Sequence, residues 1–569
     1  MNQKWIYKPE PDEDLVDGLS ISLGYGSLES KLLIMRNIDN YPKAREFFKP
    51  NIEDIHNPFL MADMQKAVER IATAIENNEK ILIYGDYDVD GTTAVSLMYL
   101  YLSKIVSRNC LDFYIPDRNS EGYGISIEGI DFAKNNGFSL IIALDCGIKA
   151  EDKIDYANSL GIDFIICDHH LPSDRLPRAY AVLDPKRKDC RYPFKELSGC
   201  GVGFKLCQGL NTIYKIPENE LFELTDLLAI SIAADIVSMT GENRYLTKIG
   251  LKNLRKTRKI GLRLLIPNEK LASYDVSNIV FEIAPKINAT GRISHAKSSV
   301  ELMISDNLKE ARNIVSKIMD LNDERRELDT ISTIDAIRQI TNNQQENNFS
   351  TIVYNPEWNK GVIGIVASRL TDIYYKPTLV FTDGNNGELI ASARSVADFD
   401  VHQALDLCSD LLLKFGGHQA AAGLSMGKDN FDEFKVRFEK IVSERIQEHQ
   451  KTPSIQIDTD IHINDLNRDF FSFHRKLAPF GPHNMKPILV LKNQKVSGQV
   501  RTMGKEDKHL KFFIKNESNG KNIECVGFKL GDFADNFKEK RFDIAFTVEE
   551  NHWKGNISYY LNIRDVRFL

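Results

Sequence analysis

The sequence lacks the features of secreted, membrane-spanning and disulfide-stapled proteins. Its first residues, MNQKWIYKPEPDED, contain no apolar signal core, and no run approaches the roughly 20 apolar residues that span a bilayer. The eight cysteines are scattered without a Cys-x-x-Cys pair, and Cys146, Cys167 and Cys200 lie in apolar or glycine-rich surroundings. Such cysteines are typical of reduced core thiols. These absences predict a cytoplasmic protein without membrane contact.

An excess of positive charge is also absent. The formal net charge is −7, with 42% hydrophobic and 27% charged residues, as in an ordinary soluble protein. Nucleic-acid binding is not excluded, because it depends on local fields and because a carboxylate-rich metal site itself adds negative charge. The 569 residues exceed what one core supports, so about three or four domains are expected.

Short apolar runs that each end in an acid recur through the first half of the chain. They read KILIYGD, CLDFYIPDR, SLIIALDCG, IDFIICDHH and AYAVLDP, with helical stretches such as SIEGIDFAKNNG and AEDKIDYANSLG between several of them. Strands that alternate with helices predict right-handed βαβ units and a largely parallel sheet. Asp86, Asp145, Asp168 and Asp184 are then expected to converge on the edge where the strands end.

The second half changes character twice. Residues 298–348 are helical and charged without Pro or Gly, which predicts one or two long helices joining two globular units. A second α/β pattern follows in STIVYNPEW, GVIGIVASRLTDIY, PTLVFTDG and ELIASARS. Alternating strands separated by polar turns then predict an all-β tail, either a small barrel or a sandwich. The first fifty or so residues contain no informative motif.

The segment ILIYGDYDVDGT alternates aspartate in the manner of an EF-hand calcium loop. The loop would need a bidentate Glu at position twelve, which is Leu97 when counted from Asp86, and a helix where ILIY resembles a buried strand. Calcium binding of that kind is therefore excluded. A core helix follows Gly91, with Thr92 or Thr93 able to cap it. The acids lie on a strand-to-helix turn, where open α/β sheets place their ligands.

The tripeptide DHH at 168–170 places two adjacent histidines at the end of a predicted buried strand. Only twelve histidines occur in the chain, and neutral imidazole oriented by a carboxylate is the commonest side-chain metal ligand. Combined with the aspartates, the pair gives oxygen and nitrogen ligands without thiolates, which favours manganese or magnesium over structural zinc. The aspartates concerned are Asp86, Asp88, Asp90 and Asp145.

Carboxylates gathered so closely repel one another, and some would protonate unless cations compensate them. Two divalent ions about 3.5–4 Å apart remove the repulsion and prepare the site for phosphoester hydrolysis. Alternatively, each acid is a separate helix cap or solvated turn residue, which is the commoner situation for a single aspartate such as Asp184 or Asp117. For Asp235, alone in the apolar stretch LLAISIAADIVSM, a salt bridge and a metal both satisfy the need for a partner.

Several motifs carry a family resemblance. YGDYDVDGTTA, ALDCGI, CDHHLP and IAADIVSM, in this order and spacing, resemble the four motifs of the DHH phosphoesterase superfamily. PKINATGRI, GVIGIVASRL, SARS and GGHQAAAG resemble the RecJ family of single-strand-specific 5′→3′ DNA exonucleases. LAPFGPHNMKP is similar to a RecJ signature that more usually has Gly and Pro where this chain has His483 and Met485. The resemblance covers about residues 50 to 569.

The resemblance implies roles for individual residues. His170 would face the scissile phosphate and Asp168 would orient its neighbours, while Asp145 would bridge two Mn²⁺ or Mg²⁺ ions. The full metal set would be Asp86, Asp88, Asp90, Asp145, His169 and Asp235. Arg292, Arg369 and Arg394 would clamp phosphates, since Arg matches phosphate bidentately. In GGHQAAAG, Gly416 and Gly417 would let backbone amides approach a phosphate, with His418 as a polar contact.

The same resemblance predicts the fold class and the domain order. We expect an α/β protein with a parallel-sheet DHH domain, a long connecting helix, a second α/β DHHA1 domain and a C-terminal OB-fold β-barrel. The expected ranges are 1–50 for an N-terminal segment, 51–297 for the catalytic domain, 298–348 for the connection, 349–450 for the substrate-binding domain and 451–569 for the OB-fold. An OB-fold binds single strands through a basic groove and stacking aromatics.

The implied activity is two-metal exonuclease hydrolysis of single-stranded DNA from the 5′ end to 5′-mononucleotides, in DNA recombination and repair. Single-strand-binding protein and a helicase are the implied partners. Two other functions stay open. A small-substrate phosphodiesterase of the same superfamily generally lacks the aspartate-rich first motif and the β tail. A non-catalytic DNA-binding scaffold with a decayed site is disfavoured by the intact acid set.

Overall fold

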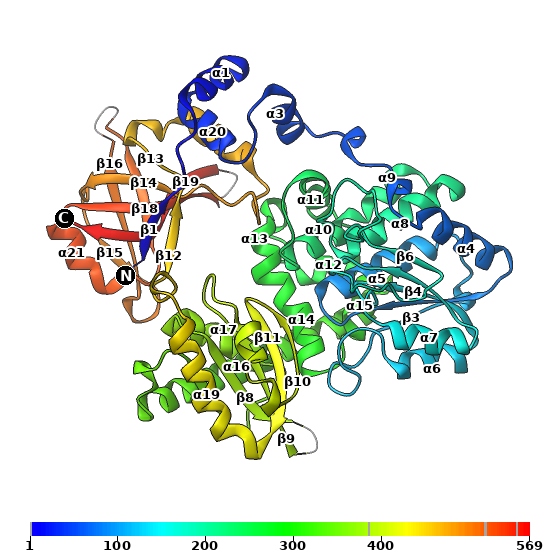
Figure 1. Cartoon of the computed structure of the whole chain (residues 1–569). Coiled ribbons are helices and arrows are strands. Elements are labelled where there is room, and N and C mark those ends of the chain that lie inside the picture. Colours follow the sequence, from blue (N-terminus) through cyan, green and yellow to red (C-terminus); the bar gives the residue numbers. More distant parts are fainter. Residues whose placement is uncertain (1–2, 385–386, 517–519, 554–555) are drawn as a thin grey trace. The chain divides into compact units, whose positions relative to one another are not determined.

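The computed structural model describes residues 3–384, 387–516, 520–553 and 556–569 (Figure 1). The chain folds into two compact units. One unit joins the chain up to Ile6 with Asp320–Gln456, and the other joins Tyr7–Met319 with Ile457–Leu569. In the described part of the chain, no helix combines the length and the apolar character needed to cross a membrane.

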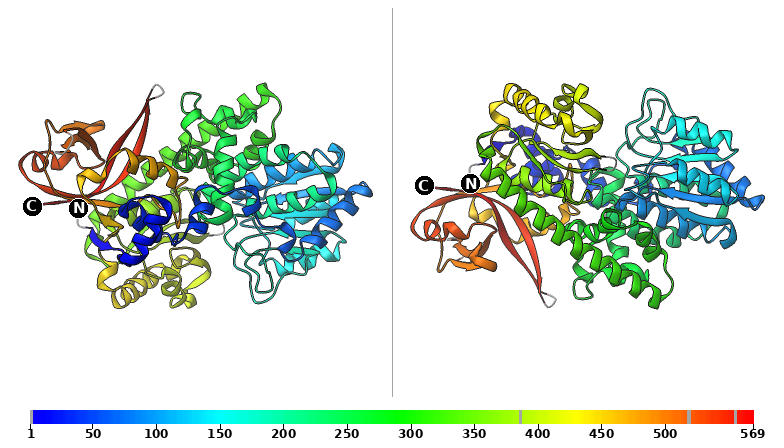
Figure 2. Two further views of the ribbon diagram at one scale, coloured as in Figure 1. Left: turned by 90° about the horizontal axis from the view of Figure 1, so that it is seen from above. Right: turned by 90° about the horizontal axis from the view of Figure 1, so that it is seen from below.

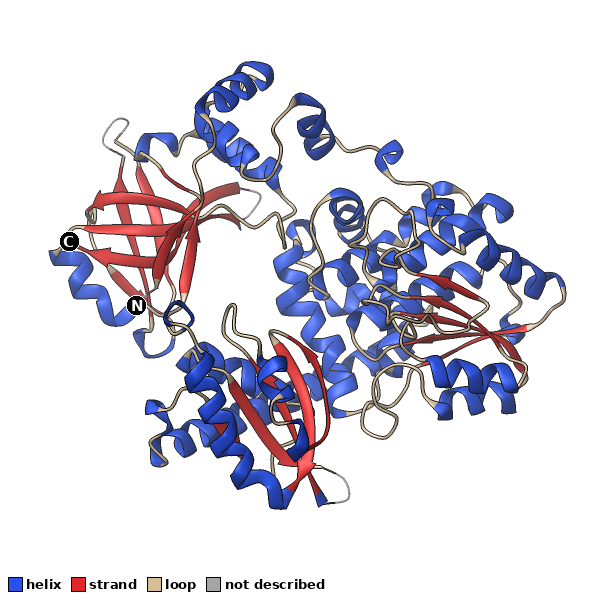
Figure 3. Cartoon of the chain, viewed as in Figure 1, coloured by secondary structure: helices blue, strands red, loops and turns tan. Residues whose placement is uncertain are grey.

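A five-stranded, fully parallel sheet organises the first half of the chain (Figure 3). Its spatial order is β3-β2-β4-β5-β6. The strands are β2 (Lys80–Gly85), β3 (Leu111–Tyr114), β4 (Phe138–Leu144), β5 (Asp163–Cys167) and β6 (Ala181–Leu183). These strands coincide with the five apolar runs, so the predicted parallel sheet is confirmed.

Helices cover both faces of this sheet (Figure 2). On β2, Ile81 and Ile83 face one core while Leu82 and Tyr84 face the other, because successive strand side chains point to opposite sides. One face packs against α4 (Met64–Glu76), α5 (Val89–Leu102), α8 (Gly199–Tyr214) and α10 (Thr225–Ala234). The other packs against α6 (Ile127–Asn135) and α7 (Glu151–Ser159). Burial on both faces explains why the strands read as continuous apolar runs.

Further helices extend the same unit before the connection. They are α9 (Glu218–Glu223), α11 (Gly241–Leu254), α12 (Ile260–Leu265), α13 (Val276–Asn278), α14 (Ala284–Ile293) and α15 (Lys297–Ile304), with a π-helical turn at Ile279–Ile283. The connection itself is α16 (Leu308–Asn342), a single helix of 35 residues. The predicted long helix is therefore confirmed.

The second α/β pattern forms a mixed five-stranded sheet in the order β10-β11-β9-β8-β7. Only β7 and β8 pair in parallel, and the other neighbours are antiparallel. The strands are β7 (Thr351–Tyr354), β8 (Thr378–Asp383), β9 (Glu388–Arg394), β10 (Leu412–His418) and β11 (Ala421–Gly427). The helices are α17 (Ile363–Tyr374), α18 (Val401–Asp406) and α19 (Phe431–Arg445).

The tail is a seven-stranded sheet in the order β13-β14-β18-β19-β17-β16-β15. In the described residues β13 and β15 are its two edges, so hydrogen bonds do not close it into the barrel that the sequence predicted. Its elements are β13 (Thr459–Asp460), α20 (Arg468–Leu477), β14 (Leu489–Gln494), β15 (Arg501–Met503), β16 (His509–Lys515), β17 (Asn522–Gly527), α21 (Ala534–Glu539), β18 (Phe542–Trp553) and β19 (Asn556–Phe568).

The N-terminal segment completes the core of this tail. It contains α1 (Glu13–Leu23), α2 (Ser27–Ile34) and α3 (Tyr41–Phe48), preceded by β1 (Lys4–Tyr7), which pairs with β12 (Ser454–Ile457). Leu19, Leu32 and Leu33 are buried in one cluster with Phe470 and Phe473 of α20. Helices α1, α2 and α3 therefore contribute to the core of the β tail, a role that no motif indicated.

Candidate metal centre

Adjacent parallel strands bring their C-terminal aspartates to one edge of the sheet. Asp86 follows β2, Asp145 follows β4, Asp168 follows β5 and Asp184 follows β6, all of them buried. The backbone amide of Asp145 donates to the carbonyl of Cys167, and that of Asp168 donates to the carbonyl of Leu183, 2.9 and 3.0 Å away. The expected convergence is therefore present, and it follows from the strand order 2-4-5-6.

The turn after β2 folds differently from the prediction. Helix α5 begins at Val89, and its N-cap is Asp88, whose side chain accepts a hydrogen bond from the amide of Gly91 at 3.0 Å. The predicted caps Thr92 and Thr93 are wrong, because their hydroxyls lie inside the helix and donate to carbonyls of the preceding turn. Asp competes well for an N-cap because its carboxylate accepts from the free first-turn amides.

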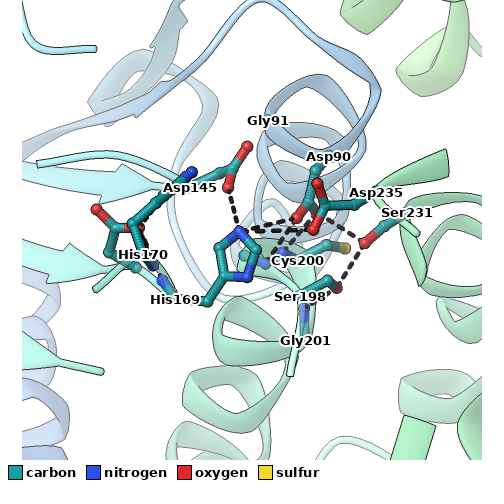
Figure 4. Close-up of polar contacts among 12 residues, drawn as sticks. Asp90, Gly91, Asp145, His169, His170, Ser198, Cys200, Gly201, Ser231 and Asp235 are labelled. Atoms are coloured by element: carbon teal, nitrogen blue, oxygen red, sulfur yellow. Dashed lines mark hydrogen bonds and ion pairs between the residues drawn. The ribbon is translucent and has the colours of Figure 1, made fainter. Parts of the chain in front are cut away.

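Asp90 lies in that first turn with its carboxylate held from three sides. The amides of Gly199 and Cys200, at the start of α8, donate to it at 2.7 and 2.9 Å, and the Ser231 hydroxyl donates at 2.7 Å (Figure 4). A helix N-terminus carries partial positive charge and stabilises an anion placed there. Asp90 is therefore fixed in orientation, with one oxygen edge directed at His169, 3.8 Å from its Nε2 atom.

His169 lies at the centre of the acids. Its Nε2 atom is 3.2 Å from Asp145 Oδ1 and 3.6 Å from Asp235 Oδ2 (Figure 4). Two overlapping groups offer ligand atoms within 4.8 Å of one another: Asp145, His169 and His170 form one, and Asp90, His169 and Asp235 form the other. Asp235 caps the end of α10 and makes no ion pair with Lys or Arg in the described chain, which removes the salt-bridge alternative.

Several buried atoms of this cluster have no hydrogen-bond partner. They are Asp86 Oδ2, Asp145 Oδ1 and both ring nitrogens of His169. Buried polar atoms are almost always satisfied in folded proteins, so a set of unpartnered atoms that are all potential metal ligands fits a cation-binding site. The donor set of carboxylate oxygens and an imidazole nitrogen fits divalent manganese or magnesium.

The ionisation of the cluster supports the same conclusion. Burial raises the pKa of Asp145 and Asp86 well above the usual range, and neighbouring carboxylates raise it further. Burial together with Asp90 and Asp88 raises the pKa of Asp235 to about 8, and that of Asp88 is also raised by burial and Asp90. Burial lowers the pKa of His169, which keeps the imidazole neutral as a ligand must be. Cations would restore the ionised carboxylates.

Asp168 and His170 form a pair beside the cluster. Asp168 Oδ1 accepts hydrogen bonds from the His170 ring Nδ1 at 2.7 Å and from the amides of His169 and His170, and Oδ2 accepts from the amide of Ile148. Burial opposes ionisation, but these bonds outweigh it and lower the pKa of Asp168 to about 2. Burial lowers the pKa of His170, and Asp168 outweighs it and raises that pKa. Asp168 therefore orients His170.

Sequence reasoning missed some residues at the site. The hydroxyl of Tyr123 lies 3.2 Å from His170 Nε2, and Tyr123 sits between Gly122 and Gly124, both with positive φ. The sequence feature that could have indicated Tyr123 is the glycine-flanked turn EGYG, which follows β3. A Cβ on Gly199 would lie 2.5 Å from Asp145 Oδ1, so only glycine fits there.

Asp184 lies outside both ligand groups, and burial raises its pKa to about 7.

Comparison with known proteins identifies the family. Profiles of three families match: the DHH family N-terminal domain over residues 80–232, the DHHA1 domain over 347–444 and the RecJ OB domain over 457–565. The chain is 37% identical to the single-stranded-DNA-specific exonuclease RecJ of Bacillus subtilis over 98% of this chain and 70% of the relative. The chain belongs to the RecJ family.

Other members agree. The RecJ exonuclease of Salmonella typhimurium is 31% identical over 89% of this chain and 90% of its own. The crystal structure of RecJ in complex with Mn²⁺ from Thermus thermophilus superposes with a TM-score of 0.83 at 25% identity, covering 99% of this chain and 79% of that one. A second crystal structure of that protein contains Mg²⁺, and its TM-score is 0.77. The fold is therefore that of RecJ, including the DHH, DHHA1 and OB domains.

The arginines predicted to clamp phosphates lie in two different units. Arg292 is half-buried in the last turn of α14. In the other unit, Arg369 of α17 forms a 2.6 Å ion pair with Asp329, and Arg394 of β9 donates to the Ser392 hydroxyl at 2.9 Å. Each unit thus presents arginine from a RecJ-like motif, and within its own unit Arg369 and Arg394 are already oriented.

The GGHQAAAG motif forms the tip of the β10–β11 hairpin. Gly416 pairs with Gly423 and His418 with Ala421, and His418 is exposed. A Cβ on Gly417 would lie 2.4 Å from the carbonyl oxygen of Ala421, so close strand pairing requires glycine there. The motif therefore lies in two paired strands and the tip between them, and its role in phosphate binding stays a prediction.

The RecJ-type signature in the tail explains one departure from the family pattern. His483 has φ +60°, a left-handed conformation that glycine adopts without strain, in accord with the Gly more usual at this position. Met485 is 66% exposed. Neither side chain lies in the metal centre.

Proposed function

We propose that this chain is a metal-dependent exonuclease that degrades single-stranded DNA from the 5′ end to 5′-mononucleotides. The observation that carries the proposal is the pair of overlapping ligand groups around His169, in which Asp145 Oδ1 and both ring nitrogens of His169 are buried without a hydrogen-bond partner. Family membership supports the substrate, since the relatives named above are single-stranded-DNA-specific exonucleases. Mn²⁺ or Mg²⁺ is the proposed cofactor, and related RecJ structures contain these metals. We propose two ions per site.

In this proposal the metals are held by the centre described above. The residues that would hold the metals are Asp86, Asp88, Asp90, Asp145, His169 and Asp235. Bound divalent ions lower the pKa of water and stabilise negative charge on phosphoryl oxygens. Asp90 keeps its orientation through α8, and the neutral His169 supplies nitrogen.

His170 faces the scissile phosphate in our proposal. Its Nδ1–H donates to Asp168, so its Nε2 atom, which lies 3.2 Å from the Tyr123 hydroxyl, is the one that would contact a phosphate oxygen. A raised pKa favours the protonated imidazole, which donates from both nitrogens and stabilises negative charge developing at phosphorus. Asp168 acts by holding this ring in one orientation.

The substrate-binding residues are proposed to be Arg292, Arg369, Arg394, His418, Gly416 and Gly417. Arginine suits this task because its planar fork matches a phosphate with two parallel hydrogen bonds. The tail sheet is proposed to hold the single strand. The proposed domain boundaries are 1–50 for the N-terminal segment, 51–297 for the catalytic domain, 298–348 for the connection, 349–450 for the substrate-binding domain and 451–569 for the OB-fold. Among the aromatic residues of the tail, Tyr559 stacks on Phe471 with the ring centroids 4.3 Å apart, and Phe512 is buried in the core.

A cytoplasmic location, single-strand-binding protein and a helicase as partners complete the proposal. A DNA substrate and eight free cysteines, seven of them buried, support the location. The partners rest on family membership alone.

Directional hydrolysis tests the function. We expect a 5′-labelled single strand incubated with Mn²⁺ to yield labelled mononucleotide from the first time point, and a 3′-labelled strand to shorten progressively. A dinucleotide should be a poor substrate compared with a long strand. Release of mononucleotide first from the 3′ label, or preference for the dinucleotide, would contradict the proposal and favour a different phosphodiesterase.

Asp168→Asn tests the orienting role. The variant removes the charged acceptor of the His170 Nδ1–H while preserving shape, and we expect the hydrolysis rate to fall about 100-fold. Because Asp168 raises the pKa of His170, the pH–rate profile should shift to lower pH. Asp155→Asn is the control, since Asp155 pairs with Arg178 on the surface at 2.8 Å. An unshifted profile in Asp168→Asn would refute the role.

A further inference from the structure

The side chain of Arg244 is enclosed by backbone carbonyls of the tail. Arg244 lies in the first turn of α11, and its five N–H groups donate five hydrogen bonds of 2.8–3.4 Å. Four acceptors are the carbonyls of residues 476–479, and the fifth is the carbonyl of Phe47. Arg244 is 3% exposed, and no carboxylate lies within 4.0 Å of it in the described chain. We call this arrangement the carbonyl cage.

The cage is joined to the metal centre by a short segment. Asp235 ends α10, and α11 begins six residues later at Gly241. Between them, the amide of Met239 donates to the carbonyl of Pro482 at 2.8 Å. The Met239 side chain packs so closely on Gly481 that a Cβ there would lie 3.0 Å from it. The segment 235–244 is thus fixed at one end by residues 476–484 of the tail, which are the last residues of α20 and the loop after it. We call these residues the tail loop 476–484.

The other end of this segment is strained. Ile236, directly after Asp235, has φ +58° and is 67% exposed. A β-branched residue in the left-handed region is a genuine outlier, and such a conformation persists only where the surroundings enforce it. The exposed Ile236 side chain has little packing to enforce it. The restraints on the segment include a local hydrogen bond from the Asn243 side-chain amide to the Ser238 carbonyl at 3.0 Å. Those supplied by the tail are the Met239–Pro482 hydrogen bond and the carbonyl cage.

We propose that Arg244 is a positioning residue for the metal centre, which acts through the segment 235–244 to hold the Asp235 carboxylate beside His169. The tail loop 476–484 then has a second task besides any contact with DNA, because it keeps a metal ligand of another domain in place. This inference rests on the proposed function in assigning Asp235 to a metal.

Mn²⁺ binding to the full-length chain tests the proposal without measuring hydrolysis. The free ion is counted by electron paramagnetic resonance during a titration, well below the unfolding temperature of each variant. We expect Arg244→Met to weaken Mn²⁺ binding about tenfold, as losing a support of a metal ligand typically does. The matched control is Arg255→Met, because Arg255 is at the other end of α11 and also donates to a backbone carbonyl, that of Tyr274.

A second variant separates positioning from general loss of stability. Glycine adopts positive φ without strain, so adding Ile236→Gly to Arg244→Met should restore most of the lost Mn²⁺ affinity without restoring thermal stability. Unchanged affinity in Arg244→Met, or an affinity that Ile236→Gly fails to restore, would overturn the inference. If the unaltered chain bound no Mn²⁺, the proposed function itself would fail, which is a different result.

Discussion

Asp145→Asn is expected to lower the rate of mononucleotide release at least about 1,000-fold, which corresponds to about 4 kcal/mol of transition-state stabilisation. The change removes one charge and little else. Asp145 has φ +60°, and Asn tolerates this left-handed conformation as well as Asp does. The side chain keeps its size against Gly199, where space is tight. Single-turnover release of a 5′-labelled nucleotide measures the effect.

The matched control is Asp163→Asn on the same sheet. Asp163 begins β5 at the opposite end from Asp168, and its carboxylate pairs with Arg70 at 2.7 Å. We expect the control to change the rate less than about twofold, because this carboxylate lies at the edge of the sheet opposite the metal centre. Single-strand affinity, measured by fluorescence anisotropy, should survive in Asp145→Asn. A variant that still degraded DNA at the normal rate would refute the metal assignment.

The cap of α5 determines how Asp88 should be tested. Asp88→Ala should abolish hydrolysis, but it also removes the N-cap of α5 and destabilises the helix by about 1 kcal/mol. Asn caps a helix as well as Asp does. Asp88→Asn therefore separates the loss of the charge from the loss of the cap.

Mn²⁺ is expected to stabilise the protein more at pH 8 than at pH 6. Without metal, the folded-state pKa of Asp235 is about 8, whereas an unfolded Asp titrates at about 3.9. Between these values the folded chain holds a proton that the unfolded chain has released, so stability falls as pH rises through this window. Bound cations stabilise the deprotonated carboxylate in the folded state, and they compete with protons for the same oxygens. The gain therefore grows with pH.

The size of the gain follows from mass action. One ion at 100 times its dissociation constant adds about 2.7 kcal/mol to the free energy of unfolding. Thermal unfolding in chelator and in Mn²⁺, at both pH values, measures it, and Asp145→Asn should lose most of the gain. An equal increase in Tm at pH 6 and pH 8 would show that the acids of this centre do not bind the ion.

Much of the catalytic half could be predicted from the sequence, for physical reasons that are specific to particular residues. The runs ending at Gly85, Leu144 and Cys167 are buried on both faces of the sheet, so they read as strands without any alignment. Parallel strands end at one edge, and this alone places Asp86, Asp145 and Asp168 together. The motif resemblance then supplied Asp235, which lies on a helix end that periodicity could not place.

The features that could not be predicted from the sequence depend on competition between local groups and on packing between residues that are distant in the chain. Thr92 and Asp88 are both good caps, and only the course of the chain after Gly85 decides between them. The sequence of GGHQAAAG does not show that it forms a hairpin, because this depends on the pairing of β10 with β11. Tyr123 reaches His170 across 47 positions of sequence. Arg244 gives no local signal, because its five acceptors are carbonyls of distant residues.

The packing of α1, α2 and α3 against α20 has a consequence for biosynthesis. Leu19, Leu32 and Leu33 emerge from the ribosome first, yet their partners Phe470 and Phe473 are made more than four hundred positions later. Throughout most of translation the tail residues that cover these leucines are not yet made, so we expect the leucines to be exposed on the nascent chain. Nascent chains arrested before residue 470 should therefore expose this region to protease, whereas the completed chain protects it.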